Sequence, residues 1–246
     1  MTKAPSDFAT LHQIVKAARE NLDQNTWDYI VGGADTETTV KRNRHALDKL
    51  SFRPRVLNDV TDLDVSATLF GRKLRIPVVL APIGSLQDLH PDGGAGTARA
   101  AAEFGTISIL SSVCKPGLEA VADSAPGINR IFQLYVRGDD DWIRDLVRRV
   151  RKAGYKLVTL TVDSAFYGNR ERLNPSQIAL RRVPERDFQK GLTWDTVKMI
   201  QDELGGIPFI VKGIMTADDA VLAVAHGVNA IYVSNHGGRQ LDHVLG

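Results

Sequence analysis

Short apolar segments alternate with amphipathic helical segments along most of this chain, and this alternation restricts the possible folds more than any other sequence feature. Apolar runs of strand length occur at residues 77–82, 106–111, 130–136, 157–162, 208–211 and 230–234. The clearest helical patterns between them cover residues 94–104, 141–153, 193–204 and 216–227. Unbroken apolar strands separated by helices predict a parallel sheet that is covered on both faces.

Polar or chemically active residues follow nearly every one of these strands at its carboxyl end. In a (β/α)8 barrel of the TIM type, that end of the strands builds the active site. The pattern therefore predicts an α/β fold with about six strand-helix units of such a barrel. An open doubly wound sheet is the alternative, but the segment Ala81-Pro82-Ile83-Gly84-Ser85 lacks the glycine-rich phosphate turn expected after its first strand.

Helical patterns also precede the first strand. Apolar residues recur at helical spacing over residues 8–18, Thr26 is a candidate cap for a short second helix, and a third helix spans about residues 36–50. We therefore divide the chain into an N-terminal helical segment, residues 1–76, which packs on the barrel, and the barrel itself, residues 77–246.

The composition is that of a soluble globular protein with one large core: 246 residues, 43% apolar content and a formal charge of +2. The near-neutral net charge argues against a nucleic-acid partner. Basic residues do gather at 144–152, but Leu146, Val147 and Val150 interleave with them at helical spacing, which predicts a solvated helix face.

The single cysteine, Cys114, excludes an internal disulfide and agrees with a reducing compartment. We expect it to be a small buried residue rather than a reactive thiol. Residues 1–7 lack the features of a secretion signal, and no apolar run approaches the roughly 20 residues that span a bilayer. These observations predict a cytoplasmic protein.

The segment after the last strand carries the strongest chemical signal. His236 and Arg239 lie three positions apart, and Gly237-Gly238 between them lets the backbone turn sharply and approach a ligand closely. An imidazole can act as a base while a guanidinium holds a carboxylate, so the pair suits the deprotonation of an anionic substrate. The alternative is a core histidine beside a surface arginine.

Several motifs occur together, in order, over almost the whole chain. They are Tyr29 with Gly33-Ala34, Ala81-Pro82-Ile83-Gly84, Ser111-Ser112, Phe132-Gln133-Leu134-Tyr135, Thr161-Val162-Asp163, Gly168-Asn169-Arg170-Glu171, Val211-Lys212-Gly213 and the segment 234–242. In these motifs the chain resembles the FMN-dependent 2-hydroxy-acid oxidoreductases, the family of glycolate oxidase, lactate dehydrogenase and mandelate dehydrogenase. The resemblance implies the TIM-type barrel, FMN as cofactor, and oxidation of an L-2-hydroxy acid to a 2-oxo acid.

The resemblance also implies roles for particular residues. His236 would be the base, and Asp163 would orient its imidazolium. Arg170 and Arg239 would clamp the substrate carboxylate, while Tyr29 and Tyr135 would place phenols on the carboxylate or the reacting oxygen. The flavin would be held by Ala81, Pro82, Ile83, Gly84, Ser111, Gln133, Thr161, Lys212 and Ser234, with no metal ion.

Several of these residues also have a purely structural alternative. Tyrosines are more often core or interface residues, an aspartate after a strand is often a helix cap, and Arg170 could be a surface loop residue. Lys212 differs, because a lysine that ends a buried strand is costly without a partner, and it would stabilise the reduced flavin near N1 and O2.

The resemblance leaves the electron acceptor open between oxygen and a quinone or another acceptor. Glycolate oxidase and lactate oxidase have alanine where this chain has Gly84, whereas mandelate dehydrogenase has glycine. This slightly favours a dehydrogenase that uses a quinone or another acceptor over an oxidase that uses oxygen. Val113 stands where glycolate oxidase has tryptophan, which leaves room for a bulkier substrate, and Ile83 replaces a common threonine.

The chain departs from the family at two places. It ends at Gly246, just after the sixth predicted strand, where the family continues with two strands that hold the flavin phosphate, and the loop after Arg172 is shorter than usual. We therefore expect a truncated barrel with weaker FMN binding. An inactive or cofactor-poor fragment and another flavin-binding barrel enzyme remain alternatives, and the assembly is open, with a homo-oligomer among the options.

Overall fold

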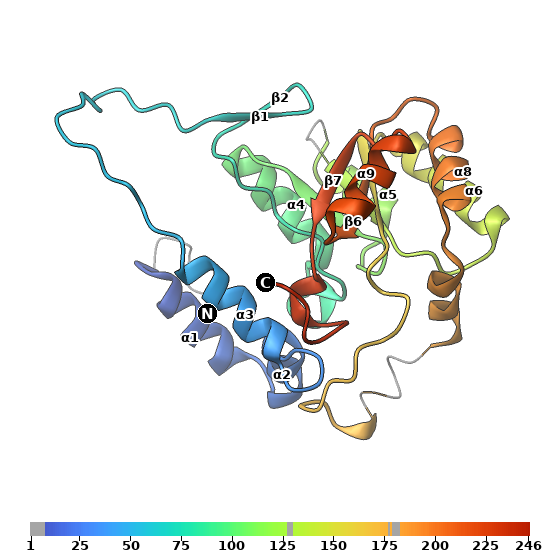
Figure 1. The fold of residues 1–246 in the computed structure, drawn as a ribbon, viewed down its shortest axis with the longest axis horizontal. Helices are drawn as coiled ribbons and strands as arrows, with labels where there is room; N and C mark the ends of the chain where they lie inside the picture. The colour runs from blue at the N-terminus through green and yellow to red at the C-terminus, as the bar shows by residue number, and fades with distance from the viewer. Residues whose placement is uncertain (1–7, 127–129, 177, 179–182) are drawn as a thin grey trace.

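A five-stranded parallel sheet forms the centre of the protein in a computed structural model, which describes residues 8–126, 130–176, 178 and 183–246 (Figure 1). Its strands are β3 (Ser108–Ser111), β4 (Arg130–Leu134), β5 (Leu157–Thr161), β6 (Phe209–Ile214) and β7 (Ala230–Val233). They lie side by side in chain order, as successive right-handed strand-helix units produce. The predicted parallel sheet is confirmed.

The two faces of the sheet bury two different apolar clusters. The larger cluster packs the helices against residues such as Phe132, Leu134, Val158, Leu160, Phe209 and Val211. On the opposite face, a smaller cluster includes Ile109, Ile131, Leu157 and Ile210. Both faces of the strands are therefore covered, which is why the sequence shows unbroken apolar runs.

The face with the smaller cluster becomes polar toward the carboxyl ends of the strands. Since side chains alternate along a strand, Gln133 and Thr159 follow Ile131 and Leu157 on this face, and they are register partners. The next pair is Thr161 with Lys212. Polar side chains are thus collected at one end of the sheet, where the sequence predicts the site.

Helices cover the larger cluster. They are α4 (Gly93–Phe104), α5 (Leu118–Ser124), α6 (Asp140–Lys152), α8 (Trp194–Leu204) and α9 (Ala217–Ala225). The Asp139 carboxylate caps α6 by accepting a hydrogen bond from the Trp142 N–H at 3.0 Å. This helix buries Leu146, Val147 and Val150 and exposes its arginines, so the predicted solvated basic face is confirmed.

The N-terminal part forms α1 (Leu11–Asn21), α2 (Gln24–Val31) and α3 (Thr38–Asp48), close to the predicted positions. The expected cap of α2 was wrong, because Asp23 accepts hydrogen bonds from the Asn25 and Thr26 N–H groups, and Thr26 lies inside the helix. No helix in the described part of the chain is long and apolar enough to cross a membrane.

The segment 77–82 differs from its predicted strand. It makes a single parallel bridge, between Leu80 and Ser108, beside β3. Prolines at 77 and 82 lack the N–H that a longer ladder needs, so pairing stops after one residue. A short antiparallel hairpin of β1 (Ala67–Leu69) and β2 (Arg72–Leu74), which the sequence pattern did not predict, precedes it.

Candidate active site

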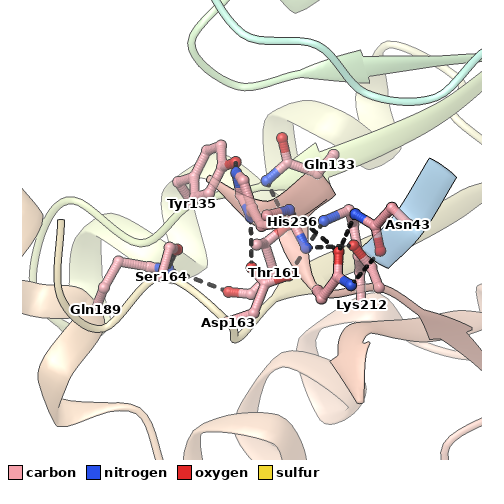
Figure 2. A network of polar contacts seen from close by, with 12 residues as sticks. Asn43, Gln133, Tyr135, Thr161, Asp163, Ser164, Gln189, Lys212 and His236 are labelled. Carbon is pink, nitrogen blue, oxygen red and sulfur yellow. Dashed lines mark hydrogen bonds and ion pairs between the residues drawn. The ribbon is translucent and has the colours of Figure 1, made fainter. Parts of the chain in front are cut away.

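A cavity of about 420 Å³ opens at the carboxyl ends of the strands. Of the predicted site residues, those that line it are Tyr29, Ala81, Pro82, Ile83, Gly84, Tyr135, Arg170, Lys212, Ser234, His236 and Arg239. Ser111, Gln133, Thr161 and Asp163 do not line it directly. The last three belong to the polar network beside it (Figure 2).

His236 lies between a carboxylate and a phenol. Its Nδ1 is 2.7 Å from Asp163 Oδ1, and its Nε2 is 3.2 Å from the Tyr135 hydroxyl (Figure 2). A carboxylate can only accept, so Nδ1 carries the hydrogen. Burial raises the pKa of Tyr135 far above its usual value, so the phenol stays protonated and donates to Nε2. His236 and Tyr135 both line the cavity, so a substrate hydroxyl could compete with the phenol for the Nε2 lone pair.

Asp163 also faces Lys212. The Lys212 ammonium is 3.4 Å from Asp163 Oδ2, and both side chains are about nine-tenths buried. Burial lowers the pKa of Lys212, and Asp163 opposes that effect. Gly213 permits this close approach: its φ is +116°, and an added Cβ would lie 2.7 Å from Asp163 Cβ. The carboxylate is thus fixed by a cation on one side and the imidazole on the other.

The turn that presents His236 has unusual backbone geometry. His236, Gly237 and Gly238 all have positive φ angles, of 58°, 64° and 71°. A histidine in this region is uncommon and is held there by neighbouring groups. The Asn235 carboxamide accepts from the Gly238 N–H at 3.2 Å and exchanges hydrogen bonds with Asn43 of α3 at 2.7 and 3.1 Å. The turn is therefore attached to the N-terminal helices.

Asp242 attaches the same segment to the first turn of α3. Its carboxylate accepts hydrogen bonds from the Thr39 N–H at 2.7 Å, the Thr38 N–H at 3.2 Å and the Thr36 hydroxyl at 3.0 Å. Burial alone would raise the pKa of Asp242, but these hydrogen bonds outweigh it and hold the pKa well below the usual 3.8. Asp242 thus caps α3 from a distant part of the chain.

We predict that Asp242→Asn lowers the free energy of unfolding at pH 7 by about 1.5–3 kcal/mol, the contribution of hydrogen bonds to a charged group. The pKa is lower in the folded state, so this stabilisation is present above about pH 4 and decreases as acid protonates the wild-type carboxylate. Urea unfolding of both proteins from pH 7 to pH 3 measures the difference. The exposed Asp123→Asn is the matched control, and an equal, pH-independent loss in both variants would contradict the capping role.

Two guanidinium groups lie on the other side of the cavity. Arg170 is 5% exposed, and its guanidinium carbon lies 4.9 Å from the ring centre of Tyr29. Arg239 donates to the carbonyl groups of Gly237, at 2.9 Å, and Ile30. Burial and the neighbouring charge of Arg170 lower the pKa of Arg239. A buried and a half-buried cation that repel each other favour an anion between them.

A close backbone contact brings these arginines together. An added Cβ on Gly168 would lie 2.5 Å from the carbonyl oxygen of Arg239, so only glycine fits there. The Gly168 N–H also donates to the Gln240 side chain at 3.0 Å. Arg170 itself is buried, which excludes the alternative that it is a surface loop residue.

The polar end of the sheet contains unused hydrogen-bonding capacity. Gln133 is fully buried and donates to the Thr161 hydroxyl at 2.9 Å, but its Oε1 has no partner in the described structure. The Thr159 hydroxyl beside it is also buried without a partner there. Buried polar atoms without partners are costly, so this surface suits a polar, planar group placed over the strand ends.

The segment 81–85 forms another wall. An added Cβ on Gly84 would lie 2.8 Å from the Val113 side chain, so the wall is closely packed. Cys114 beside it is 6% exposed and donates from Sγ to the Ile83 carbonyl at 2.9 Å. Burial raises the pKa of its thiol, which confirms the interpretation of Cys114 as a buried structural residue.

The sequence did not reveal several residues near the cavity. Gln189 lies in η3 (Pro184–Gly191), accepts from the Val136 N–H at 2.7 Å, and donates to the Thr161 carbonyl and the Ser164 hydroxyl. Arg186 from the same element and Arg137 also line the cavity. The η3 loop has no clear periodicity, so no sequence pattern identified Arg186 or Gln189. Arg137 directly follows the predicted strand 130–136, and that position was the signal that could have identified it.

Comparisons with known proteins agree with this arrangement. Residues 18–246 match the family model described as FMN-dependent dehydrogenase. Glycolate oxidase 1 of Oryza sativa subsp. indica is 40% identical over 252 residues, which cover 92% of this chain and 68% of that protein. Glycolate oxidase of Spinacia oleracea is 37% identical over 263 residues, covering 97% and 71% of the two chains.

Solved structures give the same result. A mandelate oxidase variant with (S)-mandelic acid has a TM-score of 0.86 and 33% identity, and the match covers 97% of this chain and 71% of the other. Another mandelate oxidase variant, with a C4a-OH-FMN adduct, has a TM-score of 0.84. The five parallel strands are therefore part of a TIM-type barrel, as predicted, and the sheet is open in the described residues.

Proposed function

This chain belongs to the FMN-dependent dehydrogenase family, and from that premise we propose that it oxidises an L-2-hydroxy acid to a 2-oxo acid with His236 as the base. One observation carries the proposal. His236 and Tyr135 line the same cavity as Arg170 and Arg239, and Asp163 holds His236 from behind, so a base and a carboxylate site lie within one small volume.

FMN is the cofactor of this family, and the residues present fit it. The unpaired Gln133 Oε1 and Thr159 hydroxyl offer hydrogen-bonding groups to a planar heterocycle, and Lys212 supplies a fixed positive charge. Ser111, Thr161, Ser234 and the segment 81–84 would complete the flavin site. When bound, FMN supplies the acceptor for the two electrons that leave the substrate.

His236 would take the proton of the substrate hydroxyl at Nε2. The substrate hydroxyl would replace or share the hydrogen bond that the Tyr135 phenol now donates. Asp163 would stabilise the imidazolium as it forms, because its carboxylate already accepts from Nδ1 at 2.7 Å. The tautomer and the orientation of the His236 imidazole are thus set before the substrate binds.

Arg170 and Arg239 would hold the substrate carboxylate with paired hydrogen bonds. Each guanidinium presents a planar fork of donors, and Tyr29 adds a phenol from α2 beside Arg170. This clamp would orient the hydroxyl-bearing carbon toward His236. The alternatives, a cofactor-poor fragment or another flavin-binding barrel enzyme, do not require the arginines and the histidine to act on one molecule.

Anaerobic mixing of the FMN-loaded protein with L-2-hydroxy acids tests this function. The oxidised flavin is yellow, and we expect its colour to bleach with a 2-hydroxy acid but not with the matching acid that lacks the hydroxyl. Protein that binds no flavin would support the fragment alternative. Flavin that is bound but is not bleached by any 2-hydroxy acid would support a different flavin enzyme.

The electron acceptor depends on Gly84 in this proposal. The glycine at position 84 favours a dehydrogenase, whereas the relatives named above are oxidases. Oxygen and quinones are therefore both candidate electron acceptors. We predict that Gly84→Ala raises the rate at which oxygen, relative to a quinone, reoxidises the reduced flavin. The added methyl group changes the space beside the ring, and Val113 must shift because it lies 2.8 Å from the new Cβ.

Stopped-flow reoxidation measures both rates in the wild type and in Gly84→Ala. Val113→Ala is the control for the shift of Val113 alone. An unchanged ratio of the two rates in Gly84→Ala would remove Gly84 as the determinant of acceptor choice.

A further inference from the structure

The cavity carries more positive charge than one carboxylate and the flavin require. Its described lining includes Arg137, Arg170, Arg186, Lys212 and Arg239 but no aspartate or glutamate. The proposed function uses Arg170 and Arg239 for the carboxylate and Lys212 for the flavin. Arg137 and Arg186 therefore lack an assigned anionic partner.

Arg186 is held in the cavity wall without a compensating charge. Its guanidinium carbon lies 4.6 Å from the ring centre of Tyr167, and its buried Nε has no hydrogen-bond partner in the described residues. No described carboxylate oxygen lies within 4.0 Å of Arg137 or Arg186. Burial and the neighbouring charge of Arg137 both lower the pKa of Arg186, which means that the charged form is destabilised as the site stands.

Gln189 connects the two segments that carry these arginines to the end of β5. It lies three residues after Arg186 and accepts from the Val136 N–H, next to Arg137, at 2.7 Å. Through its amide it also binds the end of β5 at the Thr161 carbonyl, at 3.1 Å. Both guanidinium groups are close enough to affect the pKa of Tyr135, the phenol that contacts His236. The additional positive charge is therefore a built part of the same cavity.

We propose that Arg186 and Arg137 bind a second anionic group of the substrate, so that the preferred substrates are 2-hydroxy dicarboxylic acids. This inference rests on the proposed function and specifies its substrate class. One carboxylate lies on Arg170 and Arg239, and the distal carboxylate lies on Arg186 and Arg137. A neutral side chain of the same length leaves the second pair of cations uncompensated, and Arg186 loses a charge-assisted hydrogen bond.

The test compares 2-hydroxyglutarate with 2-hydroxyhexanoate, whose chain ends in a methyl group. We expect the wild type to favour the dicarboxylate in kcat/KM by about tenfold or more, the effect of one charge-assisted hydrogen bond. Arg186→Gln removes most of this preference, so the ratio of kcat/KM for 2-hydroxyglutarate to kcat/KM for 2-hydroxyhexanoate falls toward one. Arg186→Lys retains part of the preference because it keeps the charge. The exposed Arg53→Gln is the control.

Calorimetric binding of 2-oxoglutarate and 2-oxohexanoate to the FMN-loaded protein separates this inference from the proposed function. If no hydroxy acid is oxidised but Arg186→Gln still weakens only 2-oxoglutarate binding, the proposed function fails and the anion site stands. If hydroxy acids are oxidised with no preference for the dicarboxylate, or if Arg186→Gln affects both ligands equally, the second anion site is wrong.

Discussion

Replacing His236 with alanine is expected to lower kcat by at least about 100-fold while FMN binding stays nearly unchanged. The His236 imidazole lines the cavity, and its Nδ1 lies 2.7 Å from Asp163 Oδ1, which leaves Nε2 as the basic nitrogen. Alanine removes the base without touching Gln133, Thr161 or Lys212, which would hold the flavin. The rate of anaerobic flavin reduction by a 2-hydroxy acid measures the loss, and a flavin titration measures binding.

Two further variants make this result specific. His236 has a φ of 58°, which alanine tolerates poorly, so His236→Asn tests the missing base with a residue that accepts this backbone conformation. His45→Ala, on the exposed side of α3, is the histidine control and should keep the wild-type rate. If either His236 variant reduces its flavin at the wild-type rate, His236 is not the base.

Changing either Arg170 or Arg239 to lysine should lower kcat/KM by about tenfold or more, although the charge is kept. A guanidinium can make two parallel hydrogen bonds to a carboxylate, whereas an ammonium acts as a point charge. Arg170 would also lose its stacking on Tyr29, whose ring centre lies 4.9 Å away. Steady-state kinetics with one 2-hydroxy acid measures the change.

The control for the clamp is Arg149→Lys, since Arg149 of α6 pairs with Glu119 of α5 and both side chains are about half exposed. It should leave kcat/KM unchanged. Competition by oxalate, a planar dianion, gives a second measurement, because both clamp variants should bind it more weakly than the wild type. Wild-type kcat/KM in both Arg170→Lys and Arg239→Lys would exclude the clamp.

Much of the fold could be predicted from local pattern. The mostly apolar runs that became β4, β5 and β6 are buried on both faces, and only a sheet covered on both sides buries such strands. The segment 77–82 was harder, because apolar content alone does not show that its prolines limit pairing to Leu80. The β1–β2 hairpin is short and lies outside the sheet, so it left almost no periodic signal.

The candidate site was predictable where a residue ends a strand and was missed where tertiary contacts define it. His236, Asp163 and Lys212 each follow an apolar run, and the structure brings them within hydrogen-bonding distance. Asp242 and Gln189 act on backbone groups that are far away in the sequence, at Thr39 and Val136. Such long-range caps and anchors depend on how the loops fold, and the spacing of residues in the sequence does not predict this.

A crystal structure of the FMN-loaded protein with a bound 2-oxo acid would show whether His236 and the two arginines act on one substrate molecule. We expect the carboxylate to lie between the Arg170 and Arg239 guanidinium groups and the oxo oxygen to lie within hydrogen-bonding distance of His236 Nε2 and the Tyr135 hydroxyl. The cavity at the carboxyl ends of β4 to β7 would then hold substrate and flavin together. An acid bound elsewhere, or bound in this cavity with its carboxylate away from both arginines, would contradict the proposed site.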